Sequence, residues 1–301
     1  MATASKIRAQ IVAAPVGARG VRAKLGLAFR RDADSGVTIL SASEQQPPLR
    51  VVRAFTAGDG AALVHLHNVS GGLLGGDELA THVRVGAEAR AQVTTTGATR
   101  LYRPRADAGV TIQRNEIVVE RNGLLEFVPD ALIPYAGARF RQETSIRLED
   151  GAGIFWWEIV APGREASGEE FRYESVEWKT ELHAGERLIA AERVRLEPRR
   201  LGPGALGRFG ENRYCATFYI CRVGLDPKFW VGAETRLREV AASLDRSDGA
   251  RWGVSALVSD GLIVRCLARH GYGILAGLRV IWSTAKEMLY GRAAIFPRKV
   301  N

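Results

Sequence analysis

The segment of residues 65–79, HLHNVSGGLLGGDEL, predicts a fixed position for the carboxylate of Asp77. Two glycine pairs flank two leucines, and Asp77 follows directly. Paired glycines indicate backbone conformations that a Cβ disfavours, or the close approach of another backbone. Because the flanking residues alternate as in strands, we expect a sharp turn with Asp77 at its exit. An Asp in this position commonly caps the turn by accepting backbone N–H groups.

Two further carboxylates lie within apolar strand patterns. Glu158 follows the residues IFWW and precedes IV, and Glu192 lies in the segment AAERV. Such a carboxylate must be ion-paired, hydrogen-bonded or in contact with water, because an unpaired buried charge is very costly. Glu158 therefore belongs either to a buried ion pair, for example with Arg164, or to the lining of a wet internal passage. The same two interpretations apply to Glu192.

His65 and His67 are two residues apart on a predicted strand, so both imidazoles share one face. They could form half of a metal site, but the five histidines and three cysteines of the chain are not grouped further, and lone histidines are the alternative. Ser70 lies in no G-x-S-x-G elbow, and the glycine loop lacks the Gly-Lys-Ser/Thr of a P-loop. We expect neither a hydrolase nor a nucleotide site, and no catalytic residue.

A basic strand pattern occurs in the segment GARFRQ, where Arg139, Arg141 and Gln142 alternate with Phe140 opposite. It is either a solvated strand face or a docking surface, because arginine is favoured at protein interfaces. Tyr135 is expected on the same surface. Thr99, in the segment TGAT, is interpreted from its local pattern as a turn hydroxyl.

The elements that must hold these residues are mostly strands. Between residues 37 and 223 the pattern has a period of two, and it predicts strands at 50–55, 89–95, 112–120 and 188–196. Frequent turn signals without helical patterns favour an antiparallel or stacked β body. A helical period appears only at residues 233–244 and 274–290, with a strand at 262–267 between them. Residues 197–208, EPRRLGPGALGR, form a possible loop or subdomain boundary.

The composition is that of an ordinary globular protein. The 301 residues are 46% hydrophobic and carry a net charge of +9. We treat them as one domain in which residues 1–20 are unassigned. The chain has no apolar run of membrane-spanning length and no apolar signal core, and its three cysteines suggest a reducing compartment. The charge favours docking to acidic surfaces. Nucleic-acid binding is the alternative, which the scattered basic residues disfavour.

Four segments in this order and spacing resemble one family. They are the glycine loop, RAQVTTTGATRLYR at residues 90–103, EFVPDALIPYAGARFRQ at 126–142 and EIVAPGREASGEEF at 158–171. Together they are similar to the urease accessory protein UreD, called UreH in some organisms. The matching region is about residues 25 to 200. The closing Pro297-Arg298-Lys299-Val300 resembles the terminal signature of the family, with Val300 in place of its usual tryptophan.

The resemblance implies a mainly β fold, with a stacked, solenoid-like (β-helical) body and two α-helices toward the C-terminus. It also implies a cytoplasmic, non-catalytic scaffold in a hetero-oligomer with UreF, with UreG bound through UreF, and with the urease apoprotein. Nucleic acid, membrane and resident cofactor are not expected. Asp77, Glu158, Glu192 and Thr99 would line a transient nickel passage, while Arg139, Arg141 and Tyr135 would bind partners. The alternative is a related scaffold that serves another metalloenzyme, or none.

A nickel passage is chemically consistent with these residue types. Imidazole and thiolate bind Ni²⁺ tightly, so a cluster of them would trap the metal. A conduit requires weak, repeated oxygen contacts that allow the ion to leave. The scattered carboxylates and the ungrouped histidines and cysteines of this sequence fit the second description.

Overall fold

The computed structural model of the chain describes residues 20–105, 108–205 and 208–297. Its strands are β1 (Arg22–Arg31), β2 (Thr38–Gln45), β3 (Leu49–Arg50), β4 (Ala54–Thr56), β5 (Ala62–Asn68), β6 (Glu78–Val85), β7 (Arg90–Thr95), β8 (Thr99–Leu101), β9 (Thr111–Val119), β10 (Leu124–Phe127), β11 (Leu132–Pro134), β12 (Arg139–Leu148), β13 (Gly153–Val160), β14 (Gly163–Arg164), β15 (Glu169–Glu170), β16 (Ser175–Ala184), β17 (Arg187–Leu196), β18 (Tyr214–Arg222), β19 (Arg251–Ala256) and β20 (Gly261–Ala268). The helices are η1 (Glu165–Ser167), α1 (Pro227–Asp248) and α2 (Gly271–Tyr290). The expectations for residues 1–19 and for the terminal residues 298–301 lie outside the described residues.

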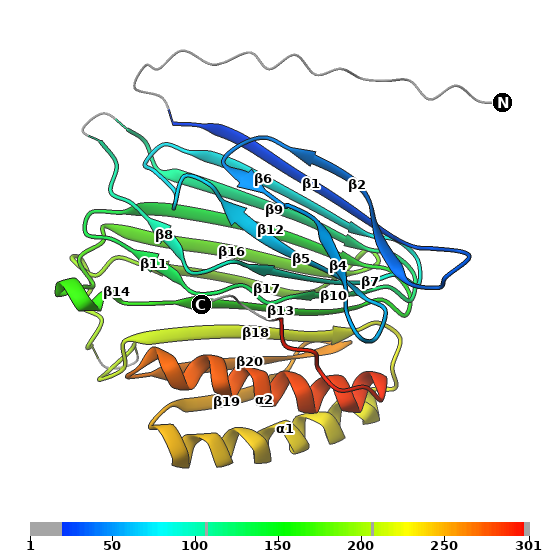
Figure 1. The fold of residues 1–301 in the computed structure, drawn as a ribbon. Coiled ribbons are helices and arrows are strands. Elements are labelled where there is room, and N and C mark those ends of the chain that lie inside the picture. Colours follow the sequence, from blue (N-terminus) through cyan, green and yellow to red (C-terminus); the bar gives the residue numbers. More distant parts are fainter. Residues whose placement is uncertain (1–19, 106–107, 206–207, 298–301) are drawn as a thin grey trace.

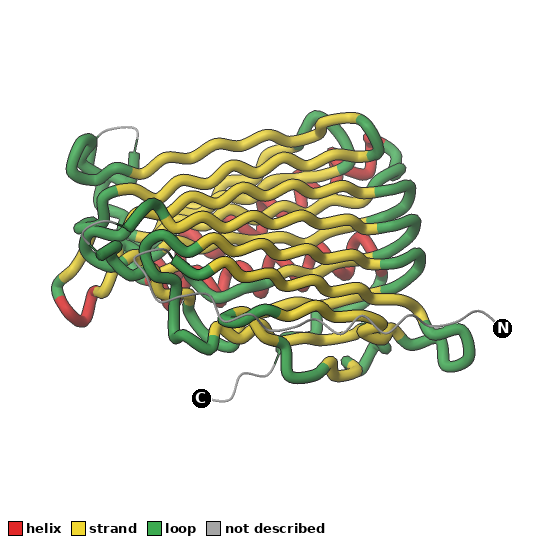
Figure 2. Tube along the Cα trace, turned by 90° about the horizontal axis from the view of Figure 1, so that it is seen from above, coloured by secondary structure: helices red, strands yellow, loops and turns green. Residues whose placement is uncertain are grey.

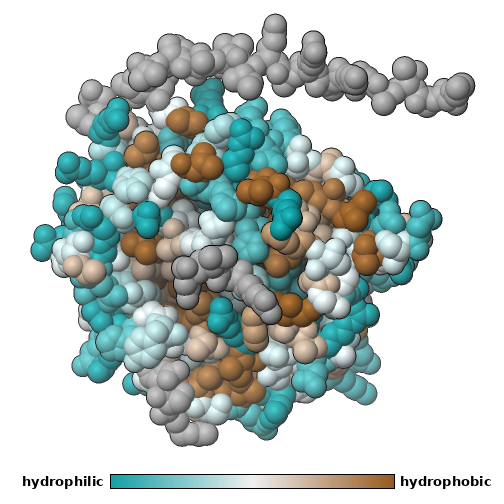
Figure 3. All heavy atoms as spheres, in the orientation of Figure 1, coloured by the Kyte–Doolittle hydropathy of each residue, from teal (hydrophilic) through white to brown (hydrophobic). Residues whose placement is uncertain are grey.

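Most of the strands form two large sheets. Sheet I has the order β17-β16-β12-β9-β6-β1-β2. Sheet II has the order β19-β20-β18-β13-β10-β7-β5-β3, with β4, β8 and β11 attached. The helices α1 and α2 lie together at the β18–β20 end of the molecule, away from β1 and β2 (Figure 1). Figure 3 shows hydrophobic residues in separate groups among polar ones on the face it presents.

Many neighbouring strands are parallel, because the chain passes from one sheet to the other. In sheet I, β6, β9, β12 and β16 pair in parallel, and in sheet II, β7, β10 and β13 do so. Seen from above, the strands of sheet I run side by side with similar lengths (Figure 2). The mainly β architecture with two helices near the C-terminus is confirmed for the described residues. The solenoid-like winding stays a prediction.

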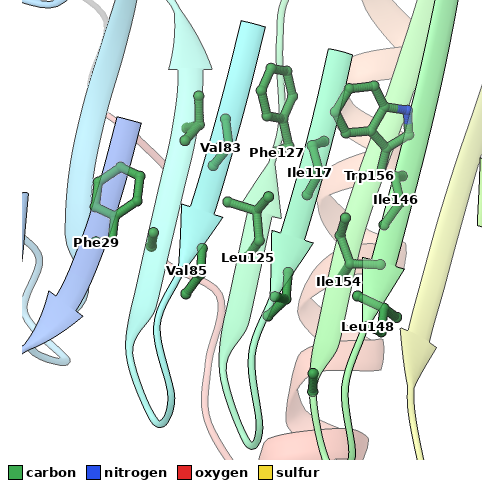
Figure 4. Close-up of a cluster of buried hydrophobic side chains, with 14 of the residues drawn as sticks. Phe29, Val83, Val85, Ile117, Leu125, Phe127, Ile146, Leu148, Ile154 and Trp156 are labelled. Atoms are coloured by element: carbon green, nitrogen blue, oxygen red, sulfur yellow. The ribbon is translucent and has the colours of Figure 1, made fainter. Parts of the chain in front are cut away.

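The largest part of the core lies between the two sheets. The period-two pattern directs alternate residues of each strand toward the opposite sheet. Figure 4 shows Val83 and Ile117 from sheet I facing the same interior as Phe127, Ile154 and Trp156 from sheet II. Fully burying one such side chain stabilises the fold by about 1.5–3 kcal/mol.

A second core lies between the opposite face of sheet II and the helices. Phe155 and Trp157 of β13 point to this side, and the indole of Trp282 on α2 packs edge-on against Trp157 at 5.6 Å. Asp226 caps the start of α1 by accepting the N–H of Lys228, and Gly249 ends the helix in the left-handed conformation. The predicted helices at 233–244 and 274–290 are confirmed, and both begin earlier than predicted.

The predicted strand at 50–55 is wrong in its middle, because β3 ends at Arg50 and β4 begins at Ala54. The side chain of Gln45 accepts the N–H of Val51 and donates to its carbonyl oxygen, at 2.9 and 3.1 Å. Residue 51 therefore bonds to a side chain instead of a strand. The predictions at 89–95, 112–120 and 188–196 match β7, β9 and β17 within one residue, and residues 197–208 belong to the connection from β17 to β18.

Candidate functional site

A row of polar side chains crosses the inner face of sheet I. The strand register places Thr81, Asn115, Thr144, Thr180 and Glu192 side by side on β6, β9, β12, β16 and β17. We call these five residues the polar rung. All except Glu192 are buried. Side chains at such positions between two packed sheets are ordinarily apolar, so the rung requires a chemical explanation.

The rung is only partly satisfied by hydrogen bonds within the protein. The amide of Asn115 donates to the Thr144 hydroxyl at 3.1 Å, and that of Gln113 donates to the Asn115 carbonyl oxygen, also at 3.1 Å. The hydroxyl of Thr180 has no partner among the described residues, although it is fully buried. Buried polar groups left without a protein partner usually contact ordered water or an ion.

Glu158, on sheet II, is joined to this rung through Gln142, whose amide also donates to the Thr144 hydroxyl at 3.4 Å. It lies on β13, and the amide of Gln142 on β12 donates to its Oε1. Its Oε2 makes no hydrogen bond of good geometry with the described residues, although the Trp156 side chain lies close enough to lower the pKa of Glu158. Burial raises the pKa of Glu158 to about 7, the Gln142 hydrogen bond opposes this, and the nearby Glu192 charge adds to it. The proposed ion pair with Arg164 is wrong, because Arg164 pairs with Glu169 instead.

Glu192 closes the side of the sandwich beside Glu158. Its Oε1 accepts from the Arg265 guanidinium at 2.8 Å, and its Oε2 accepts from the Tyr219 hydroxyl at 3.0 Å. These contacts join β17 at the edge of sheet I to β20 and β18 in sheet II. The ion-pair interpretation is therefore confirmed for Glu192. Because Arg265 is more than half exposed, the pair is in contact with solvent.

A cavity of about 580 Å³ adjoins Glu192. Glu192, Trp178 and Thr217 are among the residues that line it. Thr217 is the register partner of Glu158 on β18, and Trp178 is the register partner of Gln142 on β16. Residues of the cavity wall therefore lie on the strand next to Glu158 in sheet II and on the strand next to Gln142 in sheet I.

Asp77 caps its turn, as predicted. Its Oδ2 accepts the N–H of Leu74 at 2.8 Å and its Oδ1 accepts the N–H of Val21 at 2.9 Å. Gly75 in the same turn packs against the backbone of Pro104 so closely that a Cβ would overlap it. Asp77 precedes β6, which is separated from β17 by three strands, so it lies at least roughly 20 Å from Glu192. The structure does not bring Asp77 together with Glu192.

Thr99, the remaining residue predicted to offer an oxygen ligand, also lies apart from Glu158 and Glu192. Thr99 on β8 pairs with Leu132 on β11, which in turn pairs with Val160 of β13. His65 and His67 lie on β5 at the far side of sheet II. Among the described residues, no group of three or more His, Cys, Asp or Glu side chains is placed to hold a metal, and the three cysteines are free.

The predicted docking residues lie on the outer face of sheet I and beside it. Arg139 and Arg141 point outward from β12 and pair with Glu174 at 3.5 Å and Glu177 at 3.8 Å. Gln142, which was grouped with them, points inward, because strand alternation places it with Phe140 rather than with Arg141.

Tyr135 lies outside sheet I, directly after β11. Its ring lies 4.3 Å from the Arg164 guanidinium carbon and packs edge-on against Tyr102 at 4.9 Å. Two of the three predicted partner-binding residues therefore share one face, and the third belongs to a neighbouring aromatic and arginine group.

Two features of the structure were not predicted from the sequence. The polar rung could have been found from polar residues at inward positions of the alternating strands. The second is a buried ion pair between Glu126 on β10 and Lys286 on α2, with Nζ 2.9 Å from Oε2. No local pattern indicates it, because the two residues are 160 positions apart.

In the part of the chain that the structure describes, no helix combines the length and the apolar character that a membrane span requires.

Comparison with known proteins gives a consistent result along the chain. The family described as UreD urease accessory protein matches residues 21–301. The protein named urease accessory protein UreD from Herpetosiphon aurantiacus is 41% identical over 263 residues, covering 87% of this chain and 91% of that protein. Its namesake from Cenarchaeum symbiosum is 37% identical over 287 residues, covering 92% and 96%. That from Bacillus sp. strain TB-90 is 31% identical over 262 residues, covering 87% and 93%.

Proposed function

The chain belongs to the UreD family of urease accessory proteins, and on this premise we propose that it is a cytoplasmic scaffold for nickel delivery to urease. It is an accessory protein in urease maturation and not itself an enzyme. In the proposal it docks apo-urease on one side and UreF, with UreG bound to UreF, on another. Nickel passes through it as cargo and is not a resident cofactor.

The observation that carries this proposal is the polar rung, with Glu158 joined to it through Gln142. A divalent cation crossing a protein interior requires oxygen ligands to replace part of its hydration shell. The rung supplies hydroxyl, amide and carboxylate oxygens, and the Thr180 hydroxyl and one Glu158 oxygen make no hydrogen bond of good geometry with the described residues. The absence of imidazole and thiolate clusters in the described residues suits an ion that must leave again.

The separate positions of the carboxylates give the proposed passage two ends. Glu158 and Glu192 would serve the end at the cavity, near β17 and β20. Asp77 and Thr99 would serve the opposite end, where each Asp77 oxygen keeps a second lone pair beyond the N–H it accepts. In this proposal the rung, and not the carboxylates alone, joins the two ends.

The test compares substitutions at one rung position, Thr180. Thr180→Val removes the hydroxyl at nearly constant volume, and Thr180→Leu also narrows the interior. We expect both variants to retain solubility and capture of UreF, while the nickel content of the matured urease falls, more strongly for Thr180→Leu. Soluble yield, co-purification and metal analysis of urease measure these three quantities separately.

The matched control is Ser145→Leu, because Ser145 follows the rung residue Thr144 on β12 and has its side chain on the opposite face of the strand. It should leave the nickel content unchanged. Normal nickel content in both Thr180 variants would reject the conduit. Loss of folding in Thr180→Val would assign the rung a structural role instead.

A further inference from the structure

The cavity at the side of the sandwich is an apolar space bordered by arginines. Val194, Leu196, Phe209 and Trp252 contribute apolar surface to it. Arg195, Arg208, Arg251 and Arg265 are also among the lining residues. Its volume, about 580 Å³, is within the range of sites that accept large ligand groups. Glu192 lines the cavity and Glu158 does not, so the cavity lies beside the proposed passage and is not the passage itself.

An edge strand runs along this cavity. Among the described residues, β17 pairs only with β16, so the backbone groups on its other side are open. The edge of β19, on the far side of the cavity, is already covered by α1. Asp245 accepts the N–H of Trp252 at 2.6 Å, and Arg238 donates to the carbonyl oxygen of Val254 at 3.3 Å. Of these two edges, β17 is the one that can accept another strand.

A buried hydrogen-bond donor in the cavity wall also points to an occupant. Trp178 lines the cavity and is 6% exposed, and its indole N–H has no acceptor among the described residues. Leaving such a donor unpaired costs about 1–3 kcal/mol, which an incoming carbonyl or carboxylate oxygen would recover. The group that would complete this contact with the Trp178 indole is therefore a hydrogen-bond acceptor.

The charges select the kind of strand that fits. Arg251 makes no ion pair with another described residue, and Arg208 donates only to the backbone carbonyl of Leu201. Arg193, on β17, is 72% exposed and pairs only with Glu177 at 3.9 Å. A second copy of β17 would bring three further arginines and only one glutamate to this edge. An acidic strand would complement them.

We propose that the β17 edge and the adjoining cavity bind an extended segment of a partner protein in which large apolar residues alternate with acidic ones. The backbone of the segment pairs with β17 and its apolar side chains enter the cavity, so strand alternation places its carboxylates on the opposite face, beside Arg193. A backbone or side-chain oxygen accepts from Trp178. The inference rests on the proposed function in that a maturation scaffold docks partners, but its test requires neither nickel nor urease.

The test is a titration of the full chain with a fluorescein-labelled, end-blocked decapeptide of alternating glutamate and leucine, followed by fluorescence anisotropy. We expect saturable binding. Arg193→Glu should weaken binding at least tenfold through reversed charge, and Trp178→Phe should weaken it about fivefold through the lost hydrogen bond. The same peptide with lysine in place of glutamate should not compete.

Two matched controls keep the result specific to the cavity. Arg236→Glu makes the same charge change on the exposed face of α1. Trp230→Phe removes another buried indole N–H without a described acceptor, on a helix that does not line the cavity. Both controls should bind the peptide as the unsubstituted chain does.

Equal binding of the glutamate and lysine peptides, or wild-type affinity in Arg193→Glu, would overturn the proposal. Binding of decanoate in place of the peptide would overturn it as well, because the site would then accept a small carboxylate. Absence of peptide binding rejects the docking site even if the nickel experiment succeeds. Arg193-dependent binding supports the site even if that experiment fails.

Discussion

Lys286 on α2 and Glu126 on β10 form an ion pair inside the protein, with Nζ 2.9 Å from Oε2 and both side chains almost fully buried. The other carboxylate oxygen of Glu126 accepts from the indole of Trp282, also on α2, at 2.8 Å. Burial raises the pKa of Glu126, and the Lys286 charge opposes that shift. The pair fixes the position of α2 on sheet II, the sheet that carries Glu158.

Lys286→Met should destabilise the protein strongly, because it leaves the buried Glu126 carboxylate without its cation. The expected loss is about 3–5 kcal/mol in the free energy of unfolding, measured by urea denaturation. The double variant Glu126→Gln and Lys286→Met should recover most of that loss. A double variant as unstable as Lys286→Met would show that packing of the lysine stem, and not the stranded charge, sets the cost.

Glu158→Gln should change how stability depends on pH. The pKa of Glu158 in the folded protein is about 7, above its ordinary value of 4.5. The folded state therefore holds the proton more tightly than the unfolded state, and this contribution is lost as the pH rises from about 4.5 through 7. Glu158→Gln should be more stable than the unsubstituted chain at pH 8 by up to about 3 kcal/mol, with a smaller difference at pH 5. Denaturation at both pH values tests this, and an equal difference at both would reject the raised pKa.

Asp77→Ala and Glu192→Ala should differ in their effect on folding. Asp77 accepts two backbone N–H groups at a buried turn, so its loss should cost about 1–3 kcal/mol of stability. Removing Glu192 leaves the more than half-exposed Arg265 in contact with water, so the lost ion pair should cost about 1 kcal/mol or less, while the Tyr219 hydroxyl also loses its acceptor. Thermal denaturation ranks the two variants. If Glu192→Ala is the less stable variant, the contacts of Glu192 with Arg265 and Tyr219 contribute more to stability than the exposure of Arg265 implies.

Gly75→Ala should destabilise the glycine turn by about 1–3 kcal/mol, because its Cβ would overlap the backbone of Pro104. Gly97→Ala is the matched control. Gly97 lies in an open turn with no atom within 4 Å of an added Cβ. Equal melting temperatures for the two variants would show that the Gly75 turn can move away from Pro104.

Arg141→Ala should leave the fold intact, because Arg141 is half exposed and lies 3.8 Å from Glu177. The expected change in stability is within about 0.5 kcal/mol. If the outer face of sheet I docks a partner, capture of UreF or of apo-urease should fall, while Arg236→Ala on α1 should not reduce it. Normal capture of both proteins by Arg141→Ala would leave this face as a solvated surface.

The sequence by itself determined the parts of the protein that depend on neighbouring residues. Alternation predicted strands such as β7, β9 and β17, the 3.6-residue period predicted the late helices, and the spacing of the four segments indicated the family. The turn chemistry around Asp77 was also readable, because its partner Leu74 lies three residues away. Strand alternation should likewise have placed Gln142 inside.

Only the tertiary structure decided which distant residues meet. The amide of Gln142 reaches Glu158 across the sandwich, Arg265 reaches Glu192 over 73 positions, and Lys286 reaches Glu126 over 160. Strand alternation assigns a side chain to a face but not to a register partner, and here the sheet I strands β6, β9 and β12 are separated in the chain by strands of sheet II. The polar rung and the separation of Asp77 from Glu192 therefore follow from how the strands are stacked, because local patterns do not encode the pairing of distant strands.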